Sequence, residues 1–219
     1  MTAGPIPIDM NADKAELAEQ AIADPNALAG VVHALSGEDR GARQAAASIV
    51  REVALRQPQL LKGYADELAD ALHRPESQTR WEVLGVFERL VGVDARLVDK
   101  ALDGAETALH DEESGVVRLA AFRLLCSYGA TTERRSERIW PLIDEAIRCY
   151  HGDAEFLAML SSVQGLCSGH ASDAVKLAAA ERMDFDAQNA KGLLGRRAKQ
   201  IVACAPKKRG RKKPVEKSS

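Results

Sequence analysis

The residues with the clearest chemical signal lie near the C-terminus of the sequence. Six of the seven positions from 207 to 213 are basic: Lys207, Lys208, Arg209, Arg211, Lys212 and Lys213. Closely spaced cations bind phosphate backbones by releasing counterions, largely without regard to base sequence. Gly210 and Pro214 oppose a stable helix, so we expect a disordered basic tail over residues 205–219. Contact with nucleic acid is one prediction for this tail. A solubilising or protein-interaction role and an address signal are the alternatives.

Two cysteine–histidine pairs have the side-chain types of a zinc site. Cys149 lies two residues before His151, and Cys167 lies three residues before His170. Zinc ligands must converge to within about 2.3 Å of the metal. Residues 153–168 are expected to form one helix about 24 Å long, which would hold the two pairs apart. We therefore expect no metal site and no cofactor.

The remaining polar residues form no catalytic constellation. Asp66 and Asp70 lie one helical turn apart, but nothing apolar surrounds them that would shift a carboxyl pKa. The sequence contains neither a nucleophile elbow nor a phosphate-binding loop. We therefore expect a protein that is not an enzyme and that has no evident small-molecule substrate.

The composition favours a packed, helical body with an uneven charge. Hydrophobic residues make up 46% of the 219 positions and aromatic residues only 4%, which predicts a core of alanine and aliphatic side chains. Such small side chains suit closely packed helices better than sheets. Residues 205–219 carry a charge of +6 and the rest of the chain carries −8, although the total is only −2. This asymmetry favours an acidic partner for the tail.

The sequence also predicts a cytoplasmic location. Its four cysteines are far apart and include no Cys-x-x-Cys pair, as expected for reduced thiols inside a cell. The first 13 residues lack the basic and apolar regions of a secretory signal. No apolar run approaches the roughly 18 residues that span a bilayer, so we expect no membrane partner.

The chain repeats itself with a period of 37–38 residues. The aliphatic residue before each turn recurs at intervals of 37, 37 and 38, at Leu35, Leu72, Leu109 and Ile147. Three arginines after the turns keep the same phase, at Arg43, Arg80 and Arg118. Apolar residues follow at helical spacing, and Val50, Phe87 and Leu125 are equivalent positions in successive stripes. A helix pair of this length, stacked on copies of itself, forms a solenoid.

The periodic stripes and the turn residues predict eleven helices. Their expected ranges are 11–23, 26–36, 39–56, 59–73, 77–92, 95–109, 113–128, 133–150, 153–168, 171–183 and 186–203. We accordingly divide the chain into an N-terminal segment with a capping helix (1–25), a repeat solenoid (26–204) and the basic tail (205–219).

Two segments of the repeat resemble the HEAT-repeat family. Residues 139–143, Ile-Trp-Pro-Leu-Ile, are similar to the first helix of a HEAT repeat, which often has a proline near its start. Residues 111–121 are similar to the acidic turn and the Val-Arg-x-x-Ala opening of the second helix, and residues 38–46 are a weaker copy. The resemblance covers residues 26–170 well. It implies an all-α fold, an α-α superhelix of about five HEAT-like, armadillo-like helix pairs.

The arginines of the repeat phase have two interpretations. They could form a basic stripe that contacts phosphates. Alternatively, each could pair with an acidic residue of a neighbouring turn, such as Asp39 or Asp111. The resemblance implies the second role, because the corresponding arginine ties neighbouring repeats together in HEAT proteins generally.

HEAT repeats are common as protein-binding scaffolds, and some bind nucleic acid. The resemblance therefore implies a non-enzymatic scaffold that binds another macromolecule, most often a protein. The charge of the tail adds nucleic acid as a candidate partner there. The alternative is a DNA-repair glycosylase of the HEAT-like alkylpurine type, which surrounds a damaged nucleotide with aromatic residues and an Asp. Trp81 beside Glu82 faintly resembles such a site. Packing in the core or at an interface is the other interpretation of Trp81 and of Trp140.

Overall fold

A computed structural model of the chain describes residues 13–206. Over this range the chain forms eleven α-helices, two 3₁₀ helices and no strand. The α-helices are α1 (Lys14–Ala23), α2 (Pro25–Ala34), α3 (Arg40–Arg56), α4 (Ala65–Ala71), α5 (Ser77–Asp94), α6 (Leu102–Leu109), α7 (Gly115–Gly129), α8 (Glu133–Cys149), α9 (Phe156–Ser168), α10 (Asp173–Asn189) and α11 (Gly192–Ala203). The 3₁₀ helices η1 (Pro58–Tyr64) and η2 (Ala95–Ala101) lead directly into α4 and α6. No helix of this described part is long and apolar enough to cross a membrane.

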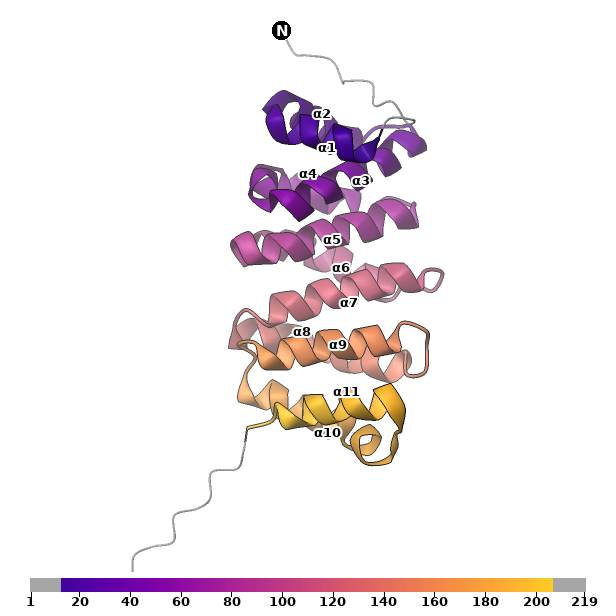
Figure 1. The fold of residues 1–219 in the computed structure, drawn as a ribbon, viewed down its shortest axis with the longest axis vertical. Helices are drawn as coiled ribbons and strands as arrows, with labels where there is room; N and C mark the ends of the chain where they lie inside the picture. Colours follow the sequence, from indigo (N-terminus) through magenta and orange to yellow (C-terminus); the bar gives the residue numbers. More distant parts are fainter. Residues whose placement is uncertain (1–12, 207–219) are drawn as a thin grey trace, which may run out of the picture.

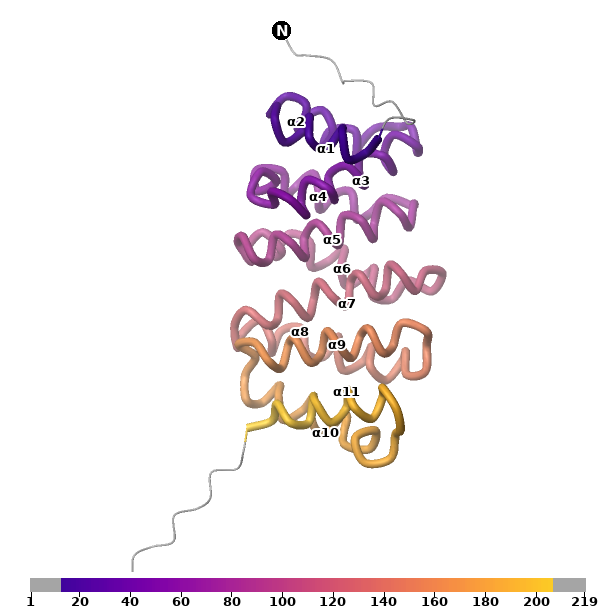
Figure 2. The backbone as a smooth tube through the Cα atoms, viewed as in Figure 1, coloured from indigo at the N-terminus to yellow at the C-terminus, as the bar shows by residue number. Residues whose placement is uncertain are grey.

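The helices stack in two layers along one long axis (Figure 1). In the odd-helix layer, α1, α3, α5, α7, α9 and α11 follow one another in contact. The second layer contains α2, α4, α6, α8 and α10, with η1 and η2. The backbone advances steadily, so that α1 and α11 lie at opposite ends of the stack (Figure 2). Five helix pairs preceded by α1 form an all-α superhelix, as the sequence predicts.

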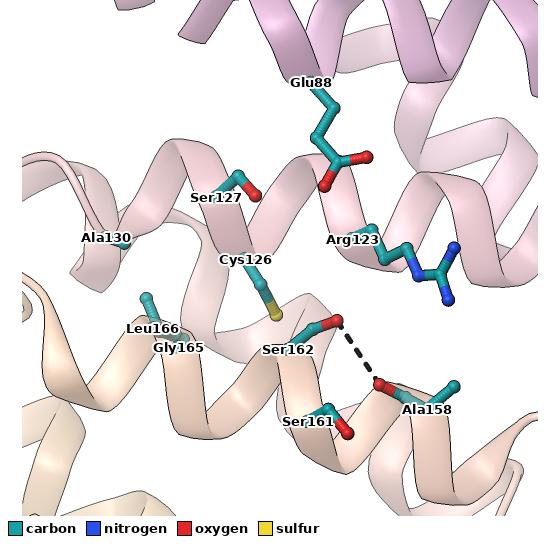
Figure 3. Close-up of a pocket in the computed structure, with 10 residues that line it drawn as sticks. All are labelled: Glu88, Arg123, Cys126, Ser127, Ala130, Ala158, Ser161, Ser162, Gly165 and Leu166. Carbon is teal, nitrogen blue, oxygen red and sulfur yellow. Dashed lines mark hydrogen bonds between the residues drawn. The ribbon is translucent and has the colours of Figure 1, made fainter. Parts of the chain in front are cut away.

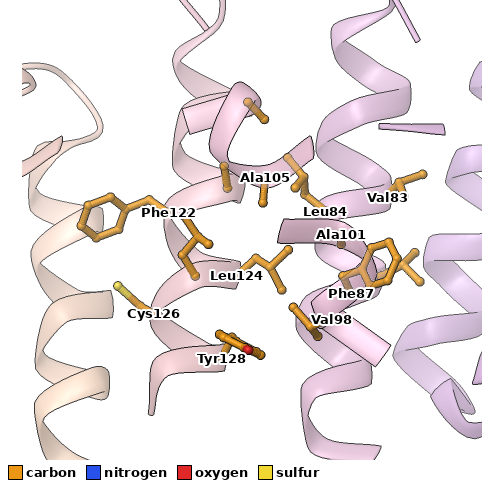
Figure 4. Close-up of a cluster of buried hydrophobic side chains, with 14 of the residues drawn as sticks. Val83, Leu84, Phe87, Val98, Ala101, Ala105, Phe122, Leu124, Cys126 and Tyr128 are labelled. Carbon is orange, nitrogen blue, oxygen red and sulfur yellow. The ribbon is translucent and has the colours of Figure 1, made fainter. Parts of the chain in front are cut away.

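The hydrophobic core extends along the whole stack. The equivalent residues Val50, Phe87 and Leu125 are at most 1% exposed, in agreement with the repeat phase. Phe87 of α5, Val98 of η2 and Leu124 of α7 belong to one cluster between neighbouring pairs (Figure 4). Because each pair buries its apolar side chains against the next, the pairs stabilise one another.

Short polar side chains determine where several helices begin. The side chains of Asp39, Ser114, Thr132 and Ser172 accept hydrogen bonds from backbone N–H groups in the first turns of α3, α7, α8 and α10. Such a cap satisfies a donor that the helix itself leaves unpaired. Pro58 begins η1, where its missing N–H costs little.

Four predicted helices differ from the structure. Those predicted at 59–73 and 95–109 each begin as a 3₁₀ helix and continue as α4 or α6. The bounds predicted for the last pair, 171–183 and 186–203, are wrong, because α10 is longer and α11 begins only at Gly192. Gly192 has a φ of +66°, which favours glycine and marks a turn rather than a helix interior.

Arg43 ties the first repeat to the second. Its guanidinium donates to both carboxylate oxygens of Glu76, in the turn before α5, and the two side chains are only 11% and 4% exposed. Arg43 Nη1 also donates to the carbonyl oxygens of Gly37 at 2.9 Å and Glu38 at 2.8 Å. The hydrogen bonds from Arg43 lower the pKa of Glu76 below its usual value. This one side chain thus fixes the relative position of two turns.

The same contact recurs in the next two repeats. Arg80 Nη1 lies 2.6 Å from Asp111 Oδ2, and Arg118 Nη2 lies 3.6 Å from Asp153 Oδ2. The structural interpretation of the repeat arginines is therefore confirmed, since each meets a carboxylate of the following repeat. The prediction that Asp39 pairs with a repeat arginine is wrong. Its carboxylate instead accepts a hydrogen bond from a backbone N–H in the first turn of α3.

A buried carboxylate, Glu82, lies between α3 and α5. Ser48 donates to Glu82 Oε1 at 3.2 Å, and Arg51 Nε lies 3.9 Å from Glu82 Oε2. Burial is the largest influence and raises the pKa of Glu82 above its usual value. Arg51 also donates to the carbonyl oxygen of Gly85 at 2.7 Å, and a Cβ at Gly85 would lie 2.5 Å from Arg51 Nη1. The absence of a side chain at Gly85 therefore makes room for the arginine.

Removal of the Phe87 ring should destabilise the stack. Phe87→Ala leaves a cavity at a fully buried position, and we expect the free energy of unfolding to fall by about 3–5 kcal/mol. Denaturant unfolding followed by circular dichroism measures this change. Phe185→Ala is the matched control, because Phe185 is 73% exposed and its loss should change stability by about 0.5 kcal/mol or less. Equal losses in the two variants would contradict the core described above.

Glu76 and Glu82 should have opposite effects on the pH dependence of stability. Because the pKa of Glu76 is lowered in the folded chain, this residue stabilises the fold above its unfolded-state pKa of about 4.5. The stabilisation is lost as the pH falls through the folded-state pKa. Because the pKa of Glu82 is raised in the folded chain, this residue stabilises the fold below its unfolded-state pKa of about 4.5. The stabilisation is lost as the pH rises through the folded-state pKa. Denaturant midpoints of the wild type, Glu76→Gln and Glu82→Gln, measured from pH 3 to pH 8, test both signs.

Relative to the wild type, Glu76→Gln should be least stable at neutral pH, and the difference should shrink below pH 4.5. Glu82→Gln should gain stability relative to the wild type as the pH rises above 4.5, because Ser48 keeps an acceptor and no charge is buried. Exposed Glu67→Gln is the control for both. If the differences in denaturant midpoint between each variant and the wild type stayed constant from pH 3 to pH 8, the opposite pKa shifts of Glu76 and Glu82 would be ruled out.

Candidate interaction surface

Four apolar residues form a row across successive odd helices. Trp81 of α5, Leu119 of α7 and Leu157 of α9 recur every 38 residues, in phase with the repeat, and Leu193 of α11 follows 36 residues later. Leu157 and Leu193 are 36% and 44% exposed, whereas Trp81 and Leu119 are half-buried. Trp81, Leu119 and Leu157 occupy equivalent places on their helices, each six residues before a buried core residue, and Leu193 lies in the first turn of α11. We call the outward surface of these four helices that carries the row the odd-helix face.

Helix α9 adds an uncharged surface to this face. None of the residues from Phe156 to Ser168 carries a charge, although a helix with one exposed side normally carries charged residues there. A Cβ added at Gly165 would meet no atom within 4 Å, so the space above the helix is open at that point. On neighbouring α7, Val116 is 57% exposed, one turn before the row. A partner could therefore approach α9 closely without desolvating a charge.

A hollow of about 490 Å³ lies between α7 and α9 (Figure 3). Small side chains of both helices line it, among them Ser127 and Ser162, together with Gly165. Glu88 reaches the hollow from α5, and the exposed Arg123 extends from α7. The hollow thus combines hydroxyl groups with one acidic and one basic side chain. These groups could hold a side chain of a partner by hydrogen bonds.

The two predicted cysteine–histidine pairs are not brought together. The unbroken helix α9 lies between them, as the sequence predicts. His151 Nε2 lies 3.2 Å from Asp186 Oδ2. Burial raises the pKa of Cys167 to about 12, so this thiol stays protonated at neutral pH and is a poor metal ligand. Over residues 13–206, no three His, Cys, Asp or Glu side chains are grouped so that they could hold a metal ion.

The other residues singled out by the sequence have structural contacts or lie outside the described range. Asp66 accepts a hydrogen bond from Lys100 at 2.6 Å. Trp81 and Trp140 both pack against the core while half-buried, which confirms the packing interpretation. The six basic residues predicted to bind nucleic acid, at positions 207–213, lie outside the residues that the structure describes.

The apolar row is not evident from the sequence alone. Its signal is the recurrence of Trp81, Leu119 and Leu157 at intervals of 38 residues. The buried stripes recur in the same phase, so periodicity alone does not separate core positions from exposed ones. Only the exposed fraction of each side chain in the folded structure separates the core positions from the exposed ones.

The known proteins that this chain resembles share its fold. No family model matches the sequence, and no curated protein matches it. A designed armadillo repeat protein superposes with a TM-score of 0.71 at 12% identity, over 90% of this chain and 97% of its own. A second one, in complex with the peptide (KR)4, gives 0.72 at 13% identity, over 88% and 90%. An archaeal HEAT-like repeats protein from Thermococcus onnurineus NA1 gives 0.58 at 13% identity, over 91% and 97%. The chain therefore has the fold of the HEAT and armadillo repeat proteins.

Proposed function

We propose that this chain is a non-enzymatic repeat scaffold that binds a segment of another protein along the odd-helix face. The observation that carries the proposal is the partly exposed row of Trp81, Leu119, Leu157 and Leu193. Apolar side chains in one line on a rigid stack gain free energy when a partner removes them from water. Their repeat spacing suits a partner segment that crosses several helices in turn.

The hollow between α7 and α9 supports the same proposal. It lies on the odd-helix face and offers hydroxyl groups with Glu88 and Arg123. Binding surfaces commonly combine an apolar area with a few polar groups that fix the orientation of the partner. A side chain inserted above Gly165 would anchor the segment, and the apolar row would hold the rest of it.

The solved structures support a peptide-like partner by analogy of fold. One designed armadillo repeat protein with this fold is in complex with the peptide (KR)4, and another is described as designed for modular peptide recognition. Their sequences are only 13% and 15% identical to this chain. The analogy therefore extends to the class of partner and not to its sequence or charge.

The basic residues at positions 207–213 add a second proposed contact, with nucleic acid. The rest of the chain carries a charge of −8 and should repel phosphates on average, whereas residues 205–219 carry +6. Nucleic-acid affinity should therefore depend on the tail rather than on the repeats. This proposal rests on sequence and charge alone.

A DNA-repair glycosylase is the alternative function, and no observation favours it. Such an enzyme needs a free carboxylate near an aromatic side chain at a nucleotide-sized site. Trp81 packs against the core, and its neighbour Glu82 is engaged by Ser48 and Arg51. Release of alkylated bases from damaged DNA by the folded chain, lost in Trp81→Ala, would favour the enzyme over the scaffold.

A bulky side chain at Gly165 should weaken partner binding without unfolding the chain. Gly165→Gln places a side chain in the open space above α9, where an added Cβ meets no atom within 4 Å. We expect capture of the partner from cell extract, quantified by mass spectrometry, to fall by about tenfold or more.

Gly63→Gln is the matched control, since an added Cβ there also meets no atom within 4 Å but lies on η1 in the other layer. It should capture the same proteins as the wild type. If all three chains captured the same proteins in equal amounts, binding would not use the odd-helix face.

Removal of the tail should abolish salt-sensitive binding to duplex DNA. Six basic residues that neutralise about six phosphates predict a slope of log affinity against log salt of about −5. A salt titration of the full chain and of a chain ending at Cys204 measures this slope. Equal binding by the two chains would exclude the tail as the nucleic-acid contact.

A further inference from the structure

A cavity of about 730 Å³ lies where α7 is followed by α8. It shares no lining residue with the hollow between α7 and α9. Three of its lining side chains are arginines from the first two turns of α8, and only one is a carboxylate. The lining residues are Asp99, Tyr128, Thr132, Arg134, Arg135 and Arg138.

Contacts with Tyr128, Thr131 and Asp99 position two of the three guanidinium groups. Arg135 Cζ lies 4.9 Å from the centroid of the Tyr128 ring, and Arg135 Nη1 donates to Thr131 Oγ1 at 3.1 Å. The Tyr128 hydroxyl donates to Asp99 Oδ1, and Arg138 Nη1 lies 3.6 Å from the same oxygen. Tyr128 and Asp99 therefore connect Arg135 and Arg138 across the cavity.

Arg134 has no hydrogen bond or ion pair from its side chain to another residue within 13–206. It is exposed and lies one turn before Arg138 on α8, so the two side chains project from the same side of the helix. The acidic residues Glu133 and Glu137 of this helix do not line the cavity. Arg134 is thus a cation at the cavity without a carboxylate of its own.

Positive charge is in excess at this cavity. Three guanidinium groups face one carboxylate, so the cavity carries a net charge of +2 within a body that is acidic as a whole. They also lie at the N-terminal end of a 17-residue helix, where the helix dipole opposes positive charge. An anion bound here would relieve the repulsion between the arginines and interact favourably with the helix end.

We propose that this cavity binds a phosphoryl group. Arginine presents planar, paired donors that match phosphate oxygens, and two of the three guanidinium groups are already held at the cavity by Tyr128, Thr131 and Asp99. Arg134 and Arg135 contact the phosphoryl oxygens, and Arg138 divides its charge between the ligand and Asp99. The cavity is larger than a phosphate ion requires, so it also accommodates part of the group that carries the phosphoryl. This site is independent of the odd-helix face and of the basic tail.

Calorimetric titration of the full chain with inorganic pyrophosphate, at constant ionic strength, tests the proposal. We expect saturable binding that weakens about tenfold or more in Arg134→Gln, an exposed position whose loss leaves the fold intact. Asp99→Asn should tighten binding by about threefold or more, because it removes a competing carboxylate while Tyr128 keeps an acceptor. A purely structural role for Asp99 predicts no such gain.

Arg148→Gln is the matched control, because Arg148 lies on the same helix outside the cavity and contacts Asp144. It should bind as the wild type does, and every variant keeps the basic tail, so differences between them report on the cavity. Displacement of pyrophosphate by a nucleoside triphosphate would show that the phosphoryl group belongs to a small molecule. Displacement by a phosphoserine peptide, but not by its unphosphorylated form, would show that the phosphoryl group is carried by a phosphorylated protein. Absence of saturable binding, or equal affinity in Arg134→Gln and the wild type, would overturn the proposal.

Discussion

A helix pair of about 37 residues has more apolar surface than its own two helices can cover, and only the next pair can bury the remainder. Phe87 illustrates the constraint, because it is fully buried by residues of its own pair and of the neighbouring ones. The alanine-rich composition allows the helices to approach closely enough for this burial. Each repeat must therefore meet the next in one fixed register. The arginines Arg43, Arg80 and Arg118 fix that register at the turns, where each reaches the carboxylate of the following repeat.

The same register produces the odd-helix face. When successive helices stack in phase, one position on each helix becomes a line along the molecule, and the partly exposed Trp81, Leu119 and Leu157 form such a line. The repeat arginines are occupied at the turns, so they do not add charge to this surface. Helix α9 contributes no charge either. The fold thereby presents apolar side chains and the uncharged helix α9 on this face, while the arginine cavity at α8 lies elsewhere.

The architecture was largely predictable because it depends on periodicity. The phase of Leu35, Leu72, Leu109 and Ile147 predicted the helix pairs. Asp111, one of the acidic residues expected to pair with a repeat arginine, is the partner of Arg80. The last pair was less predictable, because the positive φ of Gly192 depends on how the chain turns there and not on any periodic pattern.

The two candidate sites depend on contacts that no short stretch of sequence contains. Arg134, Arg135 and Arg138 are close in sequence, but Asp99 comes from η2, about one repeat earlier. Its contacts with Tyr128 of α7 and Arg138 of α8 arise only in the folded stack. The apolar row required knowledge of which periodic residues stay exposed. The basic tail differs from these sites, because its amino-acid composition alone leads to the proposal that it contacts nucleic acid.

The central claim is that neighbouring repeats stabilise one another in one continuous stack, and amide hydrogen exchange tests it most directly. Because α5 and α7 lie in the middle of the stack, farthest from its two ends, their amides should exchange most slowly. Protection should then decline gradually through α3 and α9 toward the terminal helices α1 and α11. Protection in α10 and α11 equal to that in α7, or an abrupt change between α5 and α7, would contradict the account.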